Sequence, residues 1–151
     1  MRDGDLTGLW DSGPYDYGTM ESSQLGLLPD GRGWSVWANA AGGVDVGRFR
    51  WRCPEPGVLE LRYLWWACGD WRESGGPFTL GSIDSQGPSD EVVRTGFTVG
   101  RDDTVMTDEP FTALRLEEDV QSCSTYGLVQ HEISIEDDPA HDVAPWGPCG
   151  P

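Results

Sequence analysis

The chain has 151 residues with 26 acidic and 10 basic side chains, and all of the basic residues are arginines. Its formal net charge of −16 creates a field that repels phosphate backbones and anionic lipid surfaces, so the composition argues against nucleic acids and membranes as partners. A chain of this length typically folds as one domain that buries roughly two-thirds of its unfolded surface, so its core needs no disulfide or metal.

No stretch approaches the ~20 apolar residues of a membrane span, and no apolar run follows the N-terminal segment 1–5. We therefore expect a cytoplasmic protein whose thiols stay reduced. The spacing of Cys53, Cys68, Cys123 and Cys149 matches no zinc pattern, and we predict no metal site and no cofactor. The cysteines are interpreted as small hydrophobic residues or bystanders, with a disulfide through Cys149 as the alternative.

Short apolar stretches alternate along the chain with turn-forming residues. They predict strands at residues 6–10, 22–28, 33–39, 44–53, 58–71, 91–100, 110–117 and 124–135. No amphipathic helix of useful length interrupts the series, and no long crossover connection is evident. The sequence therefore predicts an all-β fold, a single up-and-down antiparallel β-barrel of about eight strands.

The second and third strands are joined by Pro29–Gly33, which contains the proline, aspartate and glycine residues of a hairpin turn. A four-residue loop at this position sets Leu27 opposite Trp34. Residues that lie opposite each other on paired strands point to the same face of the sheet. This register therefore predicts that Trp34 faces the core together with Leu27.

The strands at 44–53 and 58–71 form the next predicted hairpin, with its turn at residues 54–57. This pairing sets Trp51 opposite Leu59 on an apolar face. The arginines Arg48, Arg50 and Arg52 then lie on the opposite face. They predict a solvated outer surface, with an anion site in the lumen as the alternative.

In the strand at 58–71, alternation predicts that Leu59, Leu61, Tyr63, Trp65 and Ala67 point inward. The second half of the strand is apolar on both faces, which indicates that a loop, the tail or a second subunit covers it. A homodimer through the Trp66/Trp71 region is therefore a possible assembly.

Residues 72–90 are rich in glycine, serine and proline and are predicted as a lid or a plain surface loop. We assign residues 1–136 to the barrel. Residues 137–151 are assigned to an acidic and then Pro/Gly-rich tail that is too irregular for secondary structure. Trp146 is the expected anchor of this tail on the barrel.

The motif Gly8-Leu9-Trp10 in the first strand resembles the G-x-W signature of the calycin superfamily, which includes lipocalins, fatty-acid-binding proteins and avidins. Residues 27–33 are similar to the second strand and hairpin of bacterial lipocalin-like domains. This resemblance implies a barrel with an internal cavity. It also implies structural roles for Gly8, Trp10 and Arg115, with Arg115 packing across Trp10 at one end.

The sequence departs from the family in ways that limit what the resemblance implies about ligands. The lipocalin Thr-Asp-Tyr motif is missing, and no avidin-type set of biotin-binding residues is present. A late-strand histidine ligates iron in some haem-binding barrels of similar outline, but their glycine-rich stretch after the first-strand tryptophan is absent here. The resemblance therefore implies no particular ligand.

The predicted inner face carries several aromatic side chains that suit an apolar or aromatic ligand. The candidate ligand-binding residues are Trp34, Trp51, Tyr63, Trp65, Phe97 and His131. For His131 a hydrogen-bonded core histidine is the alternative. We expect that the protein binds a small apolar or aromatic molecule in its lumen.

The sequence leaves two other functions open, because it contains no recognisable catalytic or phosphate-binding motif. The first is a cofactor-independent cyclase or isomerase that folds a natural-product intermediate into a reactive conformation. The second is a filled barrel that acts as a protein-interaction module. Turnover of a substrate would distinguish the enzyme from a protein that only binds a ligand. A packed lumen would favour the interaction module.

Overall fold

The computed structural model describes residues 4–15, 20–74, 76, 78–104 and 107–146. Within these residues the strands are β1 (Gly8–Asp11), β2 (Glu21–Leu27), β3 (Arg32–Asn39), β4 (Gly43–Glu55), β5 (Val58–Asp70), β6 (Ser82–Pro88), β7 (Val92–Asp102), β8 (Phe111–Val120) and β9 (Cys123–Gln130). Short 3₁₀ turns lie at Gly4–Leu6, Gly13–Tyr15 and Ile135–Asp137.

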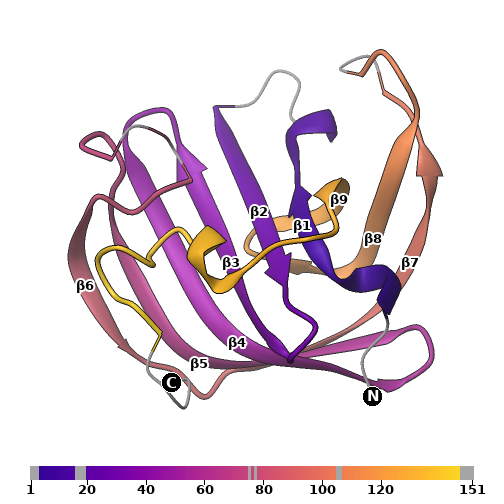
Figure 1. Cartoon of the computed structure of the whole chain (residues 1–151), viewed down its shortest axis with the longest axis horizontal. Helices are drawn as coiled ribbons and strands as arrows, with labels where there is room; N and C mark the ends of the chain where they lie inside the picture. The colour runs from indigo at the N-terminus through magenta and orange to yellow at the C-terminus, as the bar shows by residue number, and fades with distance from the viewer. Residues whose placement is uncertain (1–3, 16–19, 75, 77, 105–106, 147–151) are drawn as a thin grey trace.

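Eight of these strands close into a barrel (Figure 1). Their order is β4-β3-β2-β1-β9-β8-β7-β5, and pairing of β4 with β5 completes the ring. The pairings are antiparallel. The predicted all-β, up-and-down barrel of about eight strands is confirmed.

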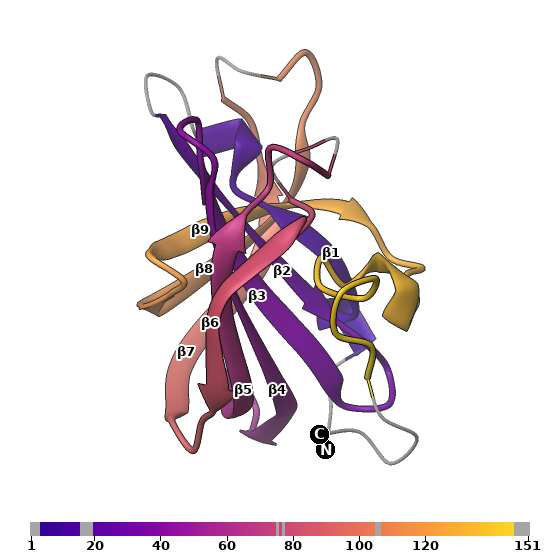
Figure 2. The same cartoon turned by 90° about the vertical axis from the view of Figure 1, so that its left-hand side faces the viewer.

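Strand β6 lies outside the ring. It replaces β7 as the neighbour of β5 over the second half of β5. Val58–Arg62 of β5 pairs with β7, whereas Trp65–Asp70 pairs with β6. Figure 2 shows β6 running beside β5 on this flank. The prediction of a continuous lid or loop at 72–90 is wrong for β6, because an available strand edge gave this Gly- and Ser-rich segment a hydrogen-bonding partner.

A bulge at Leu64 reverses the side-chain alternation of β5. Phe49 pairs with Tyr63, but Arg48 pairs with Trp65. Leu64 is therefore an extra residue that has no pairing partner on β4. Before the bulge, Tyr63 points into the barrel; after it, Trp65 points outward. The prediction that Trp65 and later odd-numbered residues face the lumen is therefore wrong.

The β2–β3 hairpin adopts a register one residue away from the predicted one. Leu27 pairs with Gly33, and Gly26 pairs with Trp34. Trp34 thus lies on the outer face, where a Cβ on Gly26 would come within 2.2 Å of its indole ring. The Leu28 N–H donates to the carbonyl oxygen of Arg32 at 2.9 Å, so three residues rather than the expected four lie between the paired ends of the strands. This one-residue slip moves every side chain of the strand to the other face.

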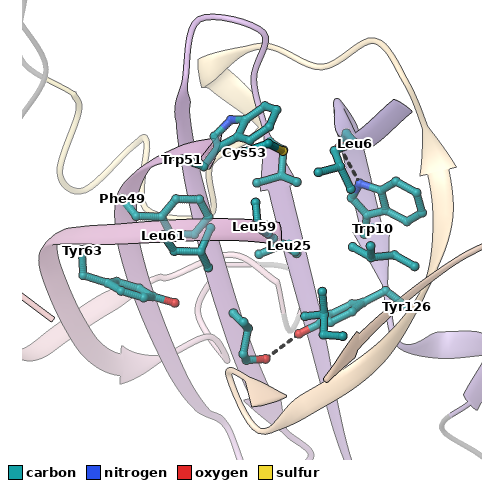
Figure 3. Close-up of a cluster of buried hydrophobic side chains, with 14 residues drawn as sticks. Leu6, Trp10, Leu25, Phe49, Trp51, Cys53, Leu59, Leu61, Tyr63 and Tyr126 are labelled. Atoms are coloured by element: carbon teal, nitrogen blue, oxygen red, sulfur yellow. Dashed lines mark hydrogen bonds between the residues drawn. The ribbon is translucent and has the colours of Figure 1, made fainter. Parts of the chain in front are cut away.

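An inner cluster of buried side chains fills much of the barrel (Figure 3). It consists of Leu6, Trp10, Leu25, Leu27, Phe49, Trp51, Cys53, Leu59, Leu61, Tyr63, Leu114, Leu116, Val120 and Tyr126. Trp10 donates from Nε1 to the carbonyl oxygen of Leu6 at 2.9 Å, and Trp51 donates in the same way to Leu28 at 2.9 Å. Trp51 pairs with Leu61 rather than Leu59. This shift of two residues keeps the predicted inward face.

A second, outer cluster lies on the opposite face of β3, β4 and β5. It consists of Val36, Ala38, Val44, Val46, Ala67, Leu80 and Ala140. Leu80 comes from the segment before β6, and Ala140 comes from the C-terminal tail. A loop and the tail therefore cover the outer face of the second half of β5, as expected, but the residues on that face are Trp65 and Ala67. Trp66, which was expected there, is 41% exposed and lies on the other face.

The tail is attached by a buried ion pair. Arg48 Nε donates to Asp138 Oδ2 at 2.6 Å, and both side chains are almost fully buried. Trp146 Nε1 also donates to Asp138 Oδ2 at 2.6 Å, and its ring lies 5.0 Å from the Arg48 guanidinium carbon. Trp146 therefore anchors the tail, as expected. Arg48 shares the outer face with Arg50 and Arg52, but the tail removes it from solvent.

Candidate functional site

A cleft of about 490 Å³ opens at the end of the barrel where β5 leaves β7 for β6. Its walls come from β4, β5, the β6–β7 connection, the start of β7, the end of β8 and the β8–β9 turn. The lining residues are Asp45, Val46, Gly47, Tyr63, Trp66, Ala67, Cys68, Ser89, Glu91, Val93, Asp119, Val120 and Gln121. Because Tyr63 and Val120 also belong to the inner cluster, the floor of the cleft is the top of the packed barrel interior.

Gly47 allows Tyr63 to lie across the floor of this cleft. A Cβ on Gly47 would come within 2.4 Å of the Tyr63 ring, so a larger residue at this position would displace the ring. On the other side, Tyr63 packs edge-on against Phe49, with ring centroids 5.3 Å apart. The sequence thus provides space for the tyrosine on one strand and an aromatic support beside it.

The Tyr63 hydroxyl starts a chain of hydrogen bonds along the floor. It lies 2.8 Å from Ser35 Oγ, which donates to Gln121 Oε1 at 2.7 Å. Since the one hydroxyl proton of Ser35 is used in that bond, Tyr63 donates to Ser35. The Tyr63 oxygen therefore offers acceptor lone pairs. Burial raises the pKa of Tyr63 to about 12, so the phenol stays protonated at neutral pH.

The β8–β9 turn holds Gln121 in place over the barrel end. Gln121 and Ser122 both adopt left-handed backbone conformations, with φ of 53° and 63°. The carbonyl oxygen of Gln121 accepts a hydrogen bond from Ser23 Oγ at 2.9 Å, and its side chain contacts Ser35. These two contacts with distant strands compensate for the unfavourable backbone of a tight turn without glycine.

Carboxylates surround the mouth of the cleft. Asp45, Glu91 and Asp119 line it, and its lining includes no arginine among the described residues. Burial raises the pKa of the Asp45 carboxyl above its ordinary value. The negative charge of Glu91 contributes to the raised pKa of Tyr63. The opening of the cleft is therefore a region of negative potential.

Of the six predicted ligand-binding residues, the structure places one, Tyr63, in the lining of the cleft. Trp51 and Phe97 also lie on the inner face, as expected, but they pack within or against the inner cluster. Trp51 is 2% exposed, so its indole is a core group rather than a cavity wall.

Trp34 and Trp65 do not lie in the lumen. Trp34 is fully buried on the outer face. The Trp65 ring lies 4.5 Å from the Arg48 guanidinium carbon, and its Nε1 donates to Gln86 Oε1 at 3.2 Å. The slipped hairpin register moves the first tryptophan outward, and the bulge at Leu64 moves the second.

His131 lies outside the barrel and is exposed. Strand β9 ends at Gln130 rather than at residue 135, and Leu128 is the residue that packs toward the inner cluster. His131 Nδ1 lies 3.1 Å from the carbonyl oxygen of Thr7. It is therefore neither a ligand-binding group of the lumen nor a core histidine.

Structural roles were predicted for Gly8, Trp10 and Arg115, and the structure places these three residues in different environments. Gly8 has a φ of +139°, and a Cβ there would lie 2.5 Å from the carbonyl oxygen of Gln130, so the position requires glycine. Trp10 is fully buried in the inner cluster. Arg115 lies on the outer face, paired with Asp102 and over the Tyr15 ring, because Leu114 and Leu116 on either side of it point inward. The expectation that it packs across Trp10 is wrong.

Sequence reasoning missed most of the cleft. Trp66 was assigned to a covered face with Trp71, but the bulge turns Trp66 into the cleft, whereas Trp71 packs against the outer cluster. The two tryptophans therefore do not form one surface. No local signal marks Leu64 as a bulge, and the β8–β9 turn has no glycine that would have drawn attention to Gln121.

Within the described part of the chain, no group of three or more His, Cys, Asp or Glu side chains has an arrangement that could hold a metal ion. None of the helical segments there is long and apolar enough to span a membrane. Cys149, the predicted alternative partner in a disulfide, lies outside the described residues. Comparisons with protein-family models, curated proteins and solved structures find no match.

Proposed function

We propose that this protein binds a small apolar or aromatic molecule in the cleft at the end of its barrel. The observation that carries the proposal is the cleft of about 490 Å³ bordered by Trp66 and Tyr63. Its volume falls within the range of about 300–1,000 Å³ that is typical of sites for small molecules.

The lining combines apolar surface with a few polar groups that would orient a ligand. Trp66, Val93 and Val120 supply the apolar walls, while Tyr63 and Gln121 supply polar atoms at the floor. Trp66 is 41% exposed, so part of its indole surface is available for contact. This combination is characteristic of sites that bind by shape and use polar contacts for specificity.

The packed interior below the cleft limits where a ligand can lie. Trp10, Trp51 and Tyr126 fill the barrel there with almost no exposed surface. We therefore assign the ligand to the mouth of the barrel rather than its centre. The same packing favours a second candidate function, an interaction module that binds another protein at its surface.

The proposal is tested with N-phenyl-1-naphthylamine, an uncharged probe whose fluorescence rises in apolar sites. We expect saturable binding by the native protein. Trp66→Ala removes one wall of the cleft and should weaken binding roughly tenfold, about 1.4 kcal/mol of lost contact energy. The readout is a fluorescence titration.

Trp65→Ala provides a matched control, because it removes the same side chain from the adjacent residue on the opposite face. It should lower stability but leave the dissociation constant within about twofold. Equal weakening by both variants, or no binding by the native protein, would contradict the proposed site. Specific capture of a partner protein by a chain that binds no probe would favour the interaction module.

A further inference from the structure

The cleft offers a ligand an aromatic wall, a buried acceptor oxygen and negative charge at the mouth. We propose that its ligand is an organic cation, a primary amine or a quaternary ammonium group on an apolar or aromatic body. This inference rests on the proposed function, and it adds the sign of the ligand's charge.

The first argument is the state of Tyr63 at the floor. The side chain is 8% exposed, and its hydroxyl proton is used in the bond to Ser35. What remains for a ligand is a lone pair, which accepts a hydrogen bond from N–H or O–H but repels an anion. An ammonium group that reaches this oxygen would donate a charge-assisted hydrogen bond to it.

The second argument is the set of charges at the mouth. Asp45, Glu91 and Asp119 line the cleft, and none of them takes part in the ion pairs formed among the described residues. The arginines in those pairs are engaged elsewhere, for example Arg52 with Glu60 and Arg48 with Asp138. A cation in the cleft would therefore meet carboxylates that form no ion pair with any arginine in the described part of the chain.

The third argument is the partly exposed indole of Trp66, which stands among these carboxylates in the same cleft. The face of an indole attracts ammonium groups through its quadrupole and also contacts apolar carbon. An aromatic amine can use both properties together. An anion would be repelled by the mouth and by the overall charge of −16.

The experiment compares three probes that share a dansyl group and a pentamethylene chain but end in an amine, a methyl group or a carboxylate. Fluorescence titration at low salt should rank the affinities as amine, methyl and carboxylate. We expect the amine to bind roughly tenfold more tightly than the methyl probe, because each nearby carboxylate contributes Coulomb attraction. The preference should shrink as salt screens the partly exposed charges.

Variants then test whether the carboxylates at the mouth of the cleft cause the preference for the amine probe. Asp45→Asn and Glu91→Gln, singly and together, should bring the affinity for the amine probe toward that of the methyl probe. They should leave the methyl probe's affinity within about twofold. Glu55→Gln is the control, since it makes the same change in charge at the exposed β4–β5 turn, at the opposite end of these strands.

The outcomes separate this inference from the proposed function. Equal binding of the amine and methyl probes, or tighter binding of the carboxylate probe, would overturn the cation assignment while leaving a ligand-binding cleft. Failure of all three probes to bind would remove both. If a carboxylate variant fails to fold, the salt dependence of the native protein still decides the question, because an amine preference unaffected by salt contradicts the assignment.

Discussion

At the scale of single residues, the cleft depends on a small residue beside a large one. Tyr63 can lie across the floor because Gly47 has no side chain beneath the ring. Its hydroxyl then reaches Ser35 and, through it, Gln121 from a distant hairpin. One glycine therefore permits a hydrogen-bond chain that connects three parts of the barrel.

Gly47→Ala tests this arrangement. The new Cβ would lie 2.4 Å from Tyr63 Cε1, so the ring must move, and we expect a loss of roughly 1–3 kcal/mol in the free energy of unfolding. Urea denaturation measures the change. Gly100→Ala is the control, because no atom lies within 4 Å of its added Cβ, and its effect should stay within about 0.5 kcal/mol. Equal effects of the two variants would contradict the role of Gly47.

The raised pKa of Tyr63 predicts a loss of stability at alkaline pH. The folded protein holds the phenol proton up to about pH 12, whereas the unfolded chain releases it near the ordinary pKa of 10.0. The contribution is thus fully present below pH 10 and is lost as the pH rises from 10 toward 12. Burial raises the pKa of Tyr126 as well, which adds to the same loss.

Tyr63→Phe should reduce this alkaline loss by roughly 1–3 kcal/mol, since each pKa unit corresponds to about 1.4 kcal/mol. Urea denaturation at neutral pH and near pH 12 compares the variant with the native protein. An unchanged dependence on pH in the variant would show that the buried phenol at position 63 does not contribute.

At the scale of elements, the C-terminal tail is held on the barrel by polar groups that are themselves buried. Arg48 is 3% exposed and contacts Asp138 from the tail, which also accepts a hydrogen bond from Trp146. Removal of one partner would leave an uncompensated charge in an apolar setting. The tail is therefore an integral part of the outer cluster.

Asp138→Asn should lower the free energy of unfolding by about 3–5 kcal/mol, because Arg48 then remains buried without its counter-charge. Arg94→Gln is the control, since Arg94 is largely exposed, lies 3.9 Å from Glu60, and its loss leaves Glu60 paired with Arg52; the change should cost less than about 1 kcal/mol. Denaturation by urea measures both.

The double variant Arg48→Met/Asp138→Leu provides a second arm if Asp138→Asn does not fold. Apolar residues in place of both charges leave no uncompensated charge, so stability should recover part of the loss. The recovery should be incomplete because the N–H groups of Trp146 and Ala140 lose Asp138 as their acceptor. A double variant as unstable as the single one would contradict a buried charge as the cause.

At the scale of the whole molecule, the cleft results from how β5 divides its length between two neighbours. Its first half pairs with β7 and closes the barrel, while its second half pairs with β6. The wall opens where the partner changes, and the β8–β9 turn covers part of that opening. The barrel is thus packed at one end and accessible at the other.

Much of the architecture followed from local patterns. Alternation of apolar residues and turn chemistry predicted all eight barrel strands to within a few residues, apart from the C-terminal limit of the last one. The inward faces of β7 and of the first half of β5 were also predicted correctly. These features depend on the alternation of side chains with a period of two residues in a strand. This period can be recognised directly in the amino-acid sequence.

The sequence by itself thus determined the all-β class, the up-and-down order and the attachment of the tail through Trp146. Only the tertiary structure decided which tryptophans face the cleft. The hairpin register at Trp34 and the bulge at Leu64 each reverse a face by one residue, and both are set by pairing between strands rather than by local preference. The chain of Tyr63, Ser35 and Gln121 likewise exists only because closure of the barrel brings distant strands together.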